Sequence, residues 1–349
     1  MRALVFQEVG VVEMVDVPKP GIEEPGDALV RVTRTAICGS DLHVVHGRIP
    51  GMSPGGVMGH EFVGVVEAVD GGVRRFAEGD RVVGSFTIPC GTCWYCERRH
   101  FSRCPDQRVF GYGSFFGDVA GAQAEYVRVP NADLVLHAID ASMSDEQALF
   151  VGDIFTTGYD CATEARIERG DVVTVVGCGP VGLMAILGAR GFEPSTIYAV
   201  DTVSQRLEMA QQLGAIAVDA REVHVPSFVQ DRTGGRGADA VLECVGLVPA
   251  LLDSIDIARA GGRISVIGVH SDQELELPLN TTFVKAIDLK FCGTANIIGR
   301  WDDALAMVSS GVVHPDEIIS HRLPLDEAVR GYELFASREA LKVVLTPAG

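Results

Sequence analysis

The feature that most constrains the fold is an apolar run that leads directly into a glycine motif. Residues 171–176 (Asp-Val-Val-Thr-Val-Val) are nearly all apolar, as expected of a parallel strand that is buried on both faces. Residues 177–182 (Gly-Cys-Gly-Pro-Val-Gly) follow with the spacing G-x-G-x-x-G, and residues 183–190 are helix-like. A strand, a glycine turn and a helix in this order predict the first unit of an open, doubly wound parallel sheet.

Strand-like and helix-like segments alternate through this part of the chain for roughly 120 residues, which favours an α/β fold. Further strands are expected at 196–200, 215–218, 238–243 and 263–269, and helices at 204–213, with Ser204 as a plausible N-cap, and at 249–260. The first part of the chain differs, because short alternating strands lie between Pro and Gly turns there. It predicts a β-rich antiparallel barrel or sandwich. Residues 301–308 (helix) and 342–345 (strand) are expected to pack back on this first part.

The glycine motif also predicts a dinucleotide site. Gly177 permits the tight turn, Gly179 lets backbone amides approach a diphosphate, and Gly182 lets helix and strand pack closely. Asp201 ends the next expected strand, where an acid can accept hydrogen bonds from ribose hydroxyls and repel a 2′-phosphate. This favours NAD over NADP, although the nearby Arg206 could soften the preference. The alternative is a structural turn beside a solvated Asp201.

Four cysteines lie close together in the β-rich part, at Cys90, Cys93, Cys96 and Cys104. Four thiolates can enclose a tetrahedral zinc ion with no open coordination position, so such a zinc would hold a loop and do no chemistry. The alternatives are an iron–sulfur cluster, whose usual last spacing is shorter, and disulfides or free thiols. The spacing favours structural zinc in a lobe at 90–104.

A second, dispersed set of possible metal ligands comprises Cys38, His60 and Asp153, with Glu61 beside His60. One thiol, one imidazole and one carboxylate leave a fourth position open, as in catalytic zinc sites. Spacing alone is weak evidence here, because each residue has an ordinary structural alternative: a core thiol, a satisfied histidine or a helix-capping acid.

Four motifs together resemble the zinc-containing medium-chain alcohol dehydrogenase family. They are residues 38–43 (Cys-Gly-Ser-Asp-Leu-His), 59–64 (Gly-His-Glu-Phe-Val-Gly), the four-cysteine lobe and residues 177–182, in the family's order. The resemblance covers essentially the whole chain. It implies a GroES-like catalytic domain at 1–153 and 295–349, a Rossmann NAD-binding domain at 154–294, and an active-site cleft between them.

The resemblance also implies roles for individual residues. Cys38, His60 and Asp153 look like the ligands of a catalytic zinc, with Glu61 as an alternative or exchangeable fourth and Asp41 orienting His60. Ser40 and His43 resemble a relay that takes the proton of the alcohol while its hydride passes to NAD. Many members have a cysteine at the position of Asp153, so this third ligand departs from the commoner pattern. The residues implied for the coenzyme are Thr157, Gly177, Gly179, Pro180, Val181, Gly182, Asp201, Arg206, Ile267, Gly268 and Val269, and Phe86 is implied for the substrate pocket.

The implied activity is a zinc-dependent, NAD-dependent alcohol dehydrogenase with two zinc ions per subunit, one catalytic and one structural. The substrate would be a secondary alcohol, a diol or polyol, or a small primary alcohol or its aldehyde. Two rival functions are a non-catalytic NAD-binding or lens-type structural protein and a zinc-lobe DNA-binding regulator. Retention of the four residues Cys38, Ser40, His43 and His60 argues against the first.

Charge and hydropathy bear on partners and location. The formal net charge of −18 argues against nucleic acid as a main partner, and no apolar run is long enough to span a membrane. No signal peptide is visible, and nine cysteines without a leader favour a reducing, cytoplasmic compartment. The resemblance implies a homo-oligomer, with a tetramer favoured over a dimer and residues 263–269 as a candidate edge strand between subunits.

Overall fold

The fold is described by a computed structural model that covers residues 1–270 and 274–348. Contacts divide the chain into two compact units, which are named unit 1 (Met1–Asp153 with Asn296–Gly349) and unit 2 (Ile154–Ala295). Each unit buries apolar cores of its own. Within the described ranges, none of the helices is both long and apolar enough to cross a membrane.

Unit 1 is built mainly from strands. Its strands are β1 (Arg2–Glu8), β2 (Val11–Asp16), β3 (Ala28–Ile37), β4 (Glu61–Val69), β5 (Arg81–Gly84), β6 (Thr87–Ile88), β7 (Arg108–Val109), β8 (Tyr126–Val129), β9 (Leu136–Ala138), β16 (His321–Pro324) and β17 (Val343–Thr346). Its α-helices are α1 (Gly39–Val45), α2 (Ala132–Val135), α3 (Asp145–Val151), α10 (Ile297–Ser309) and α11 (Ala328–Ala336). Short 3-10 turns lie in the cysteine lobe at Cys96–Arg98 and Phe101–Arg103, and further along at Ser114–Phe116, Pro315–Ile318 and Leu325–Glu327.

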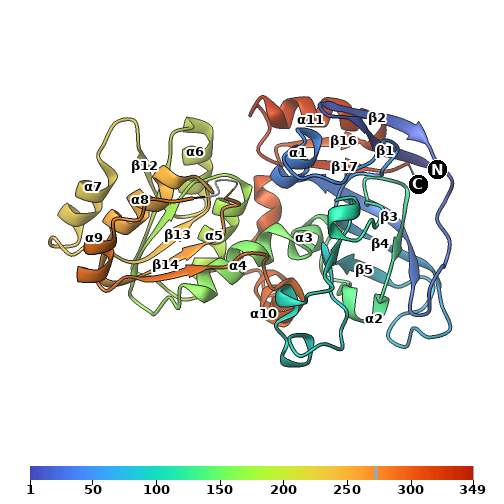
Figure 1. The fold of residues 1–349 in the computed structure, drawn as a ribbon, viewed down its shortest axis with the longest axis horizontal. Helices are drawn as coiled ribbons and strands as arrows, with labels where there is room; N and C mark the ends of the chain where they lie inside the picture. The colour runs from blue at the N-terminus through green and yellow to red at the C-terminus, as the bar shows by residue number, and fades with distance from the viewer. Residues whose placement is uncertain (271–273, 349) are drawn as a thin grey trace. The chain divides into compact units, whose positions relative to one another are not determined.

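The main sheet of unit 1 joins the two ends of the chain. Its order is β16-β17-β3-β4-β5-β9, with β8 also paired to β3. Strand β17, near the C-terminus, runs antiparallel to β3, so the red strand lies beside the blue one in Figure 1. Strands β3 and β4 are rich in valine, whose branched side chain packs well on a pleated surface. The pairing of β17 with β3 places residues 343–346 on the sheet of the first part of the chain.

Unit 2 alternates strands and helices. Its strands are β10 (Val172–Val176), β11 (Thr196–Asp201), β12 (Ile216–Asp219), β13 (Ala238–Glu243), β14 (Ala258–Val266) and β15 (Asp288–Phe291). Its helices are α4 (Ile154–Glu164), α5 (Pro180–Arg190), α6 (Ser204–Gln212), α7 (Val225–Arg232), α8 (Val248–Ile257) and α9 (Leu279–Val284).

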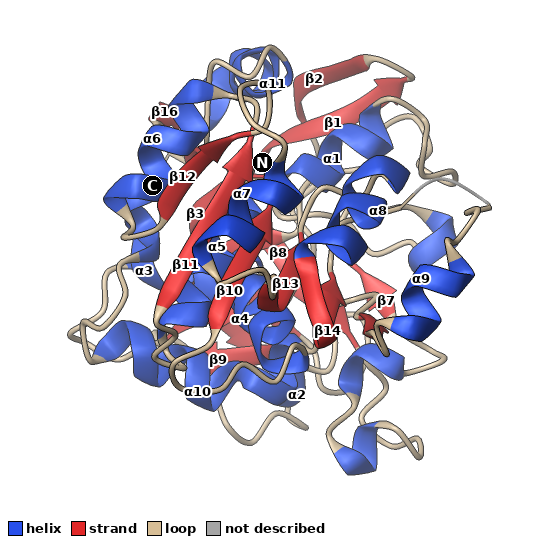
Figure 2. Cartoon of the chain, turned by 90° about the vertical axis from the view of Figure 1, so that its left-hand side faces the viewer, coloured by secondary structure: helices blue, strands red, loops and turns tan. Residues whose placement is uncertain are grey.

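The sheet of unit 2 has the strand order of a doubly wound fold. All neighbouring pairs are parallel, in the order β12-β11-β10-β13-β14-β15, and Figure 2 shows helices α5 to α8 flanking these strands. The chain reverses its direction of winding between β10 and β13, and ligands of such folds bind outside the carboxyl ends of the strands at this point. The expected parallel sheet is confirmed, and β10 is its first strand.

Three local expectations were wrong. Val203, and not Ser204, is the N-cap of α6, because Val203 has an extended backbone (φ −103°, ψ 114°) and Ser204 is the first helical residue. Helix α8 ends at Ile257, and the residues expected to continue it begin β14. Strand β14 is not at the edge of the sheet, because β15 pairs with its outer side.

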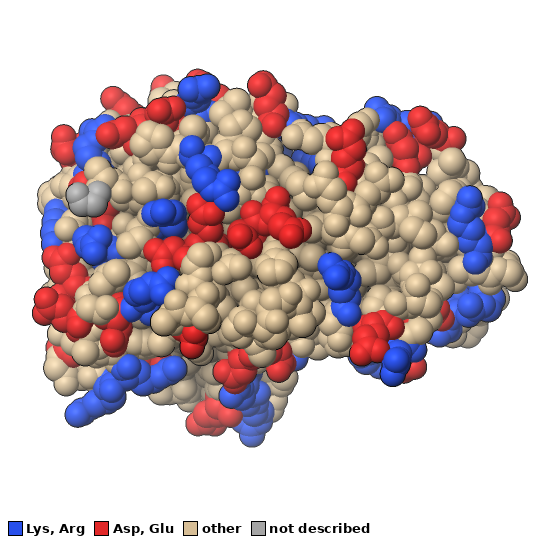
Figure 3. Space-filling view, turned by 180° about the vertical axis from the view of Figure 1, so that it is seen from behind, with Lys and Arg blue, Asp and Glu red and all other residues tan. Residues whose placement is uncertain are grey.

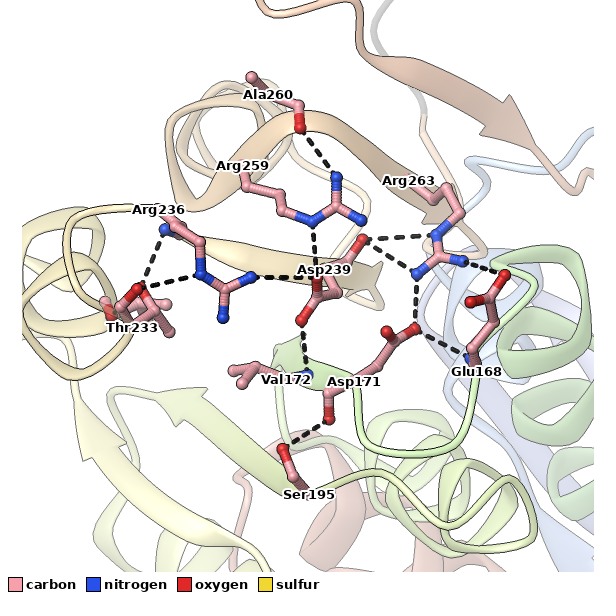
Figure 4. A network of polar contacts seen from close by, with 12 residues as sticks. Glu168, Asp171, Val172, Ser195, Thr233, Arg236, Asp239, Arg259, Ala260 and Arg263 are labelled. Carbon is pink, nitrogen blue, oxygen red and sulfur yellow. Dashed lines mark hydrogen bonds and ion pairs between the residues drawn. The ribbon is translucent and has the colours of Figure 1, made fainter.

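A network of ion pairs fastens the amino ends of three strands in unit 2 (Figure 4). Asp239 in β13 accepts hydrogen bonds from Val172 N in β10 and from Arg259 Nε in β14, at 2.8 and 2.5 Å. Arg263 in β14 reaches Asp171 at 2.5 Å. Burial alone would raise the pKa of Asp239, but these partners outweigh it and the pKa is lowered. The network lies at the end of the sheet opposite to the glycine turn, so its role is structural.

The charged side chains are dispersed on the face drawn in Figure 3. Lys and Arg lie singly or beside acids there, and they do not form one continuous basic surface. This distribution agrees with the net charge of −18. On this face the chain offers no extended surface that a phosphate backbone would bind.

Candidate functional site

The ends of three adjacent strands bring the dispersed ligand set together in unit 1. Cys38 follows β3, His60 immediately precedes β4, and Lys342 immediately precedes β17. The register pairs Ala36 with Glu61 and Ile37 with Val343, so these residues lie at the same edge of the sheet. Strand pairing thus explains how residues that are far apart in sequence meet.

The imidazole of His60 is held from both sides. Its Nδ1 lies 3.0 Å from Asp41 Oδ1, and its Nε2 lies 3.1 Å from Asp153 Oδ2. Burial opposes protonation of this ring, but the charge of Asp41 and the contacts with both carboxylates raise the pKa of His60 well above its ordinary value. The contact with Asp41 orients the ring and turns Nε2 toward Asp153, as is usual for metal-binding histidines.

Cys38 and Ser40 lie at the start of helix α1. The Ser40 hydroxyl donates to Cys38 Sγ at 3.2 Å and lies 3.5 Å from His60 Nε2. Asp41 closes the turn by accepting a hydrogen bond from Cys38 N at 2.9 Å. The hydroxyl of Ser40 is therefore close to Cys38 and His60, two of the ligands expected from the sequence, where a reacting oxygen could contact it.

Asp153 reaches the site at the end of helix α3, next to a close backbone approach. A Cβ on Gly152 would lie 2.4 Å from the carbonyl oxygen of Gly84, so a side chain would not fit there. The Gly152 carbonyl accepts a hydrogen bond from Phe86 N at 3.3 Å. The ring of Phe86 then lies edge-on to His60, with centroids 5.9 Å apart. Asp153 and Phe86, which were both named from the sequence, thus lie beside His60.

Only one of the two carboxylate oxygens of Glu61 has a partner among the described residues. Its Oε1 lies 2.6 Å from Lys342 Nζ, and neither side chain is exposed. Its Oε2 has no hydrogen-bond partner among the described residues. Burial raises the pKa of Glu61, and Asp153 adds to this effect while Lys342 opposes it. One carboxylate oxygen thus remains available to a cation.

The donor set fits a metal ion. The ligand atoms of Cys38, His60, Glu61 and Asp153 lie within 4.8 Å of one another. Three buried carboxylates (Asp41, Glu61 and Asp153) and a thiol lie together here, with Lys342 beside Glu61 and His60 between Asp41 and Asp153. An excess of buried negative charge is costly unless a cation balances it. Sulfur, nitrogen and oxygen donors together are the set that zinc accepts.

The four-cysteine lobe fits a second metal ion. The Sγ atoms of Cys93 and Cys96 are 3.5 Å apart and those of Cys90 and Cys96 are 4.0 Å apart. A tetrahedron of thiolates around zinc has edges of about 3.8 Å, since each Zn–S bond is about 2.3 Å. Hydrogen bonds from backbone N–H groups, that of Thr92 above all, lower the pKa of Cys90 to about 6. All nine cysteines of the chain are described and all are free, so disulfides do not occupy these thiols.

The glycine turn of unit 2 offers an open cradle. Gly177 has a φ of +90°, and a Cβ on Gly182 would lie 1.8 Å from the carbonyl oxygen of Gly177. A Cβ on Gly179 would meet nothing closer than Arg206 Nη1, at 3.9 Å. Two of the three glycines are therefore required by the turn itself. The third leaves free space at the start of α5, where the helix N-terminus favours a phosphate.

Asp201 lies beside this turn, at the carboxyl end of β11. Its carboxylate accepts hydrogen bonds from Cys178 N at 2.7 Å, Thr202 N at 2.7 Å and Val203 N at 2.9 Å. Arg206 lies 3.8 Å from the same carboxylate. Backbone donors thus fix the orientation of Asp201 next to Gly179.

The remaining expected coenzyme residues also lie in unit 2. Thr157 is buried in helix α4, and Pro180 and Val181 open helix α5. The N–H groups of Ile267 and Gly268 bond to the carbonyl of Glu243, just beyond β14, and the side chain of Val269 is exposed. These residues belong to the same unit as the glycine turn.

His43 lies in helix α1 and is partly buried. Burial, followed by the charges of Arg48 and His46, lowers the pKa of His43. A neutral imidazole at this position can accept a proton near neutral pH.

Four residues of this region were missed by the sequence interpretation: Lys342, Tyr112, Gln123 and Tyr332. Lys342 left a signal, because it is a lysine directly before the apolar strand β17. Tyr112 lies edge-on to His60, with ring centroids 5.4 Å apart, but the loop that carries it shows no periodicity. Gln123 and Tyr332 are ordinary residues in sequence and acquire meaning only through their contacts.

Comparisons with known families match both units. Residues 24–139 match the family described as "Alcohol dehydrogenase GroES-like domain", and residues 180–310 match "Zinc-binding dehydrogenase". A zinc-type alcohol dehydrogenase-like protein of Bacillus subtilis is 35% identical and spans 99% of this chain and 100% of its own length. The erythritol/L-threitol dehydrogenase of Mycolicibacterium smegmatis is 33% identical over 96% of this chain and 94% of its own.

Solved structures agree with this result. An alcohol dehydrogenase from Thermus sp. ATN1 superposes with a TM-score of 0.97 at 45% identity and covers 100% of both chains. A zinc-binding dehydrogenase of Sinorhizobium meliloti, solved with NADP bound, has a TM-score of 0.88 at 27% identity and covers 99% of both chains. The expected fold class, a GroES-like β-rich part with a doubly wound parallel sheet, is confirmed.

Proposed function

Since the chain belongs to the zinc-dependent alcohol dehydrogenase family, we propose that it transfers a hydride reversibly between an alcohol and NAD. Family membership makes it an oxidoreductase that acts on alcohols. The observation that carries the finer proposal is the meeting of Cys38, His60, Glu61 and Asp153 within 4.8 Å. Unit 1 would carry the chemistry and unit 2 would bind the dinucleotide.

Cys38, His60 and Asp153 would hold the catalytic zinc, with Glu61 Oε2 as a further oxygen donor. When bound, zinc is a Lewis acid that lowers the pKa of an alcohol and polarises a carbonyl. Asp41 keeps the ring of His60 in its orientation, and Lys342 balances part of the charge of Glu61. The four thiols of the cysteine lobe would hold the second, structural zinc.

The proton of the alcohol would leave through side chains of helix α1. The Ser40 hydroxyl lies within 3.5 Å of both Cys38 Sγ and His60 Nε2, so it is placed to take a proton from an oxygen bound beside them. His43, one turn further along the helix, would pass the proton on to solvent. Its lowered pKa keeps the imidazole neutral and able to accept.

We propose NAD as the coenzyme because of where Asp201 lies. The carboxylate is held beside the open face of Gly179 by three backbone N–H groups, and a 2′-phosphate there would meet a fixed negative charge. Arg206, 3.8 Å away, weakens this repulsion only in part. Thr157 and the segment Ile267–Val269 would contact the nicotinamide.

An apolar alcohol is the proposed substrate, rather than a polyol. Beside His60 lie the rings of Phe86 and Tyr112, and Phe116 packs edge-on to Tyr112 with centroids 5.7 Å apart. Phe115, with 65% of its surface exposed, continues this aromatic wall. Each extra hydroxyl of a polyol would lose its water against these rings and remain unpaired, at a cost of about 1–3 kcal/mol.

We propose a homo-oligomer on the surface of unit 2, while the preference for a tetramer over a dimer rests on the family resemblance. Strand β15 forms one edge of the sheet, and four large apolar side chains on it and on α9 are 52% to 80% exposed. They are Leu279, Phe283, Val284 and Phe291. Exposed apolar side chains along a strand edge are typical of a subunit interface. Light scattering at micromolar concentration measures this association, and a monomer there would contradict it.

Alcohol-dependent formation of NADH by the purified protein tests the proposed function. The expected result is an increase in NADH absorbance with at least one class among primary, secondary and polyhydroxy alcohols. If the protein binds NAD but oxidises no alcohol from any class, a non-catalytic NAD-binding protein replaces this proposal.

A further inference from the structure

A chain of buried polar contacts, two hydrogen bonds and one close ion-pair contact, joins helix α11, near the C-terminus, to the ring of His60. The Tyr332 hydroxyl donates to Gln123 Oε1 at 2.8 Å, and Gln123 Nε2 donates to Asp41 Oδ2 at 3.2 Å. Asp41 Oδ1 in turn lies 3.0 Å from His60 Nδ1. All four side chains are buried.

The chemistry of the neighbours fixes the direction of this chain. Gln123 Nε2 faces two oxygens that can only accept, the Asp41 carboxylate and the carbonyl of Ala36 at 3.1 Å. The amide nitrogen must therefore be on this side and the amide oxygen on the side of Tyr332. Burial, reinforced by the charge of Asp41, raises the pKa of Tyr332 well above its ordinary value, so its hydroxyl keeps the proton that it donates.

Gln123 is also fixed against the residue that precedes His60. Its backbone N–H bonds to the carbonyl of Met58 at 2.8 Å. A Cβ on Gly59 would lie 2.3 Å from Gln123 Cγ, so the side chain of Gln123 lies directly on the glycine backbone. The amide has little freedom to move, and it presents its N–H group to Asp41 in one place.

Asp41 depends on this partner for its orientation. Its Oδ2 accepts from Cys38 N at 2.9 Å and from Gln123 Nε2, and these two bonds direct Oδ1 toward His60. Without the amide, the carboxylate keeps one backbone donor and can rotate about its Cβ–Cγ bond. The ring of His60 would then be held less firmly with its Nε2 toward Asp153, the orientation in which it could bind a metal.

We infer that Gln123 and Tyr332 are positioning residues of the catalytic metal site, which hold Asp41 and through it the imidazole of His60. This inference rests on the proposed function, because it assumes that His60 binds zinc. The two residues touch neither substrate nor coenzyme. Their effect is therefore expected in how tightly one zinc ion is held.

The test follows zinc release from the zinc-loaded, full-length protein in the presence of a chelator, with a colorimetric zinc indicator. Gln123→Leu should release one of the two zinc ions about tenfold faster than the parent, and Tyr332→Phe about threefold faster, since partners of ligands typically contribute 10- to 100-fold in affinity. Thr33→Val is the matched control. It removes a hydroxyl that donates to Asp145 at 2.6 Å elsewhere in unit 1, and it should release zinc as the parent does.

The double variant Gln123→Leu/Tyr332→Phe separates a chain from two independent contributions. Once the amide is gone, Tyr332 has nothing to donate to, so the double variant should release zinc no faster than Gln123→Leu. Two results would overturn the inference. One is that both single variants have lower thermal stability but release zinc at the parental rate. The other is that the effects of the two substitutions on the rate of zinc release are fully additive in the double variant. A parent that holds no zinc outside the cysteine lobe would instead refute the proposed function.

Discussion

The ammonium of Lys342 lies 2.6 Å from the carboxylate of Glu61, at a point where neither side chain is exposed to solvent. The pair joins the strand next to the C-terminus to the strand that follows His60. A buried charge pair thus lies at the candidate metal site, and Lys342, directly before β17, takes part in that site.

Lys342→Met should destabilise the protein strongly. The substitution leaves Glu61 charged, buried and without its cation, and breaking a buried pair in this way typically costs about 3–5 kcal/mol. The midpoint of urea unfolding of the zinc-loaded protein measures this. Glu61→Gln/Lys342→Met should recover most of the loss, because no charge then remains unpaired. A single variant as stable as the parent would mean that Glu61 does not depend on Lys342, either because Glu61 is neutral or because the bound zinc balances its charge.

NAD should be used with a higher kcat/KM than NADP. Asp201→Asn should reduce the ratio of these two kcat/KM values by at least about fivefold, because it removes a charge that repels the 2′-phosphate of NADP. The amide oxygen can still accept from Thr202 N and Val203 N, while the acceptor for Cys178 N is lost, so the fold should persist with some loss of stability. Asp201→Gly should narrow the difference too, but at a greater loss of stability. Asp219→Asn, on the neighbouring strand β12, is the control. A parent that prefers NADP would show that Asp201 does not face the ribose.

His43→Gln should slow turnover near neutral pH while zinc content and NAD affinity stay the same. A general acid–base group contributes roughly 10² to 10⁴-fold, and a relay open to water should lose toward or below the lower end. Because the pKa of His43 is lowered, the parent ring is neutral and active from below neutral pH upward. The defect should shrink as pH rises, since hydroxide can then accept the proton.

The exposed His314→Gln is the control for this experiment. The profiles must be measured with a substrate whose chemical step limits the rate. Identical pH profiles for His43→Gln and the parent would remove His43 from the mechanism.

Straight-chain primary alcohols from ethanol to octanol should be oxidised with a kcat/KM that rises by up to about fourfold per methylene, because each buried methylene gains about 0.8 kcal/mol. Benzyl alcohol should exceed erythritol and sorbitol. Phe116→Ala should flatten the series, because it removes part of the aromatic wall beside Tyr112. Phe335→Ala, which removes a ring elsewhere in the same core cluster, should leave the slope unchanged. Preferential oxidation of erythritol would contradict the apolar substrate but not the dehydrogenase activity.

The parallel sheet could be predicted because its signals are local. Residues 171–182 contain a buried strand, a turn and a helix start in one stretch, and the four cysteines of the lobe are equally local. The edge of that sheet could not be predicted. Strand β15 has the weakly apolar sequence Asp-Leu-Lys-Phe, and its pairing with β14 depends on a contact distant in sequence.

The residues that contact the expected metal ligands could not be predicted from the sequence either. Cys38, His60 and Asp153 were named from motifs, whereas Gln123 and Tyr332 reach Asp41 only because unit 1 brings a loop and helix α11 to the start of β4. A glutamine in an unpatterned loop and a tyrosine on the buried side of an amphipathic helix carry no sign of that role. Buried polar partners of this kind are recognised by satisfied hydrogen bonds in three dimensions, which spacing cannot express.

The most direct test of the central claim is a zinc count made together with an assay of alcohol-dependent NADH formation. The parent should contain two zinc ions per subunit and oxidise alcohols, because the two ligand sets share no residue. His60→Ala should retain only the zinc of the four-cysteine lobe, remain folded and bind NAD, yet form no NADH at any pH. A parent with a single zinc ion after careful handling, or a His60→Ala variant that retains both ions and parental turnover, would contradict the account.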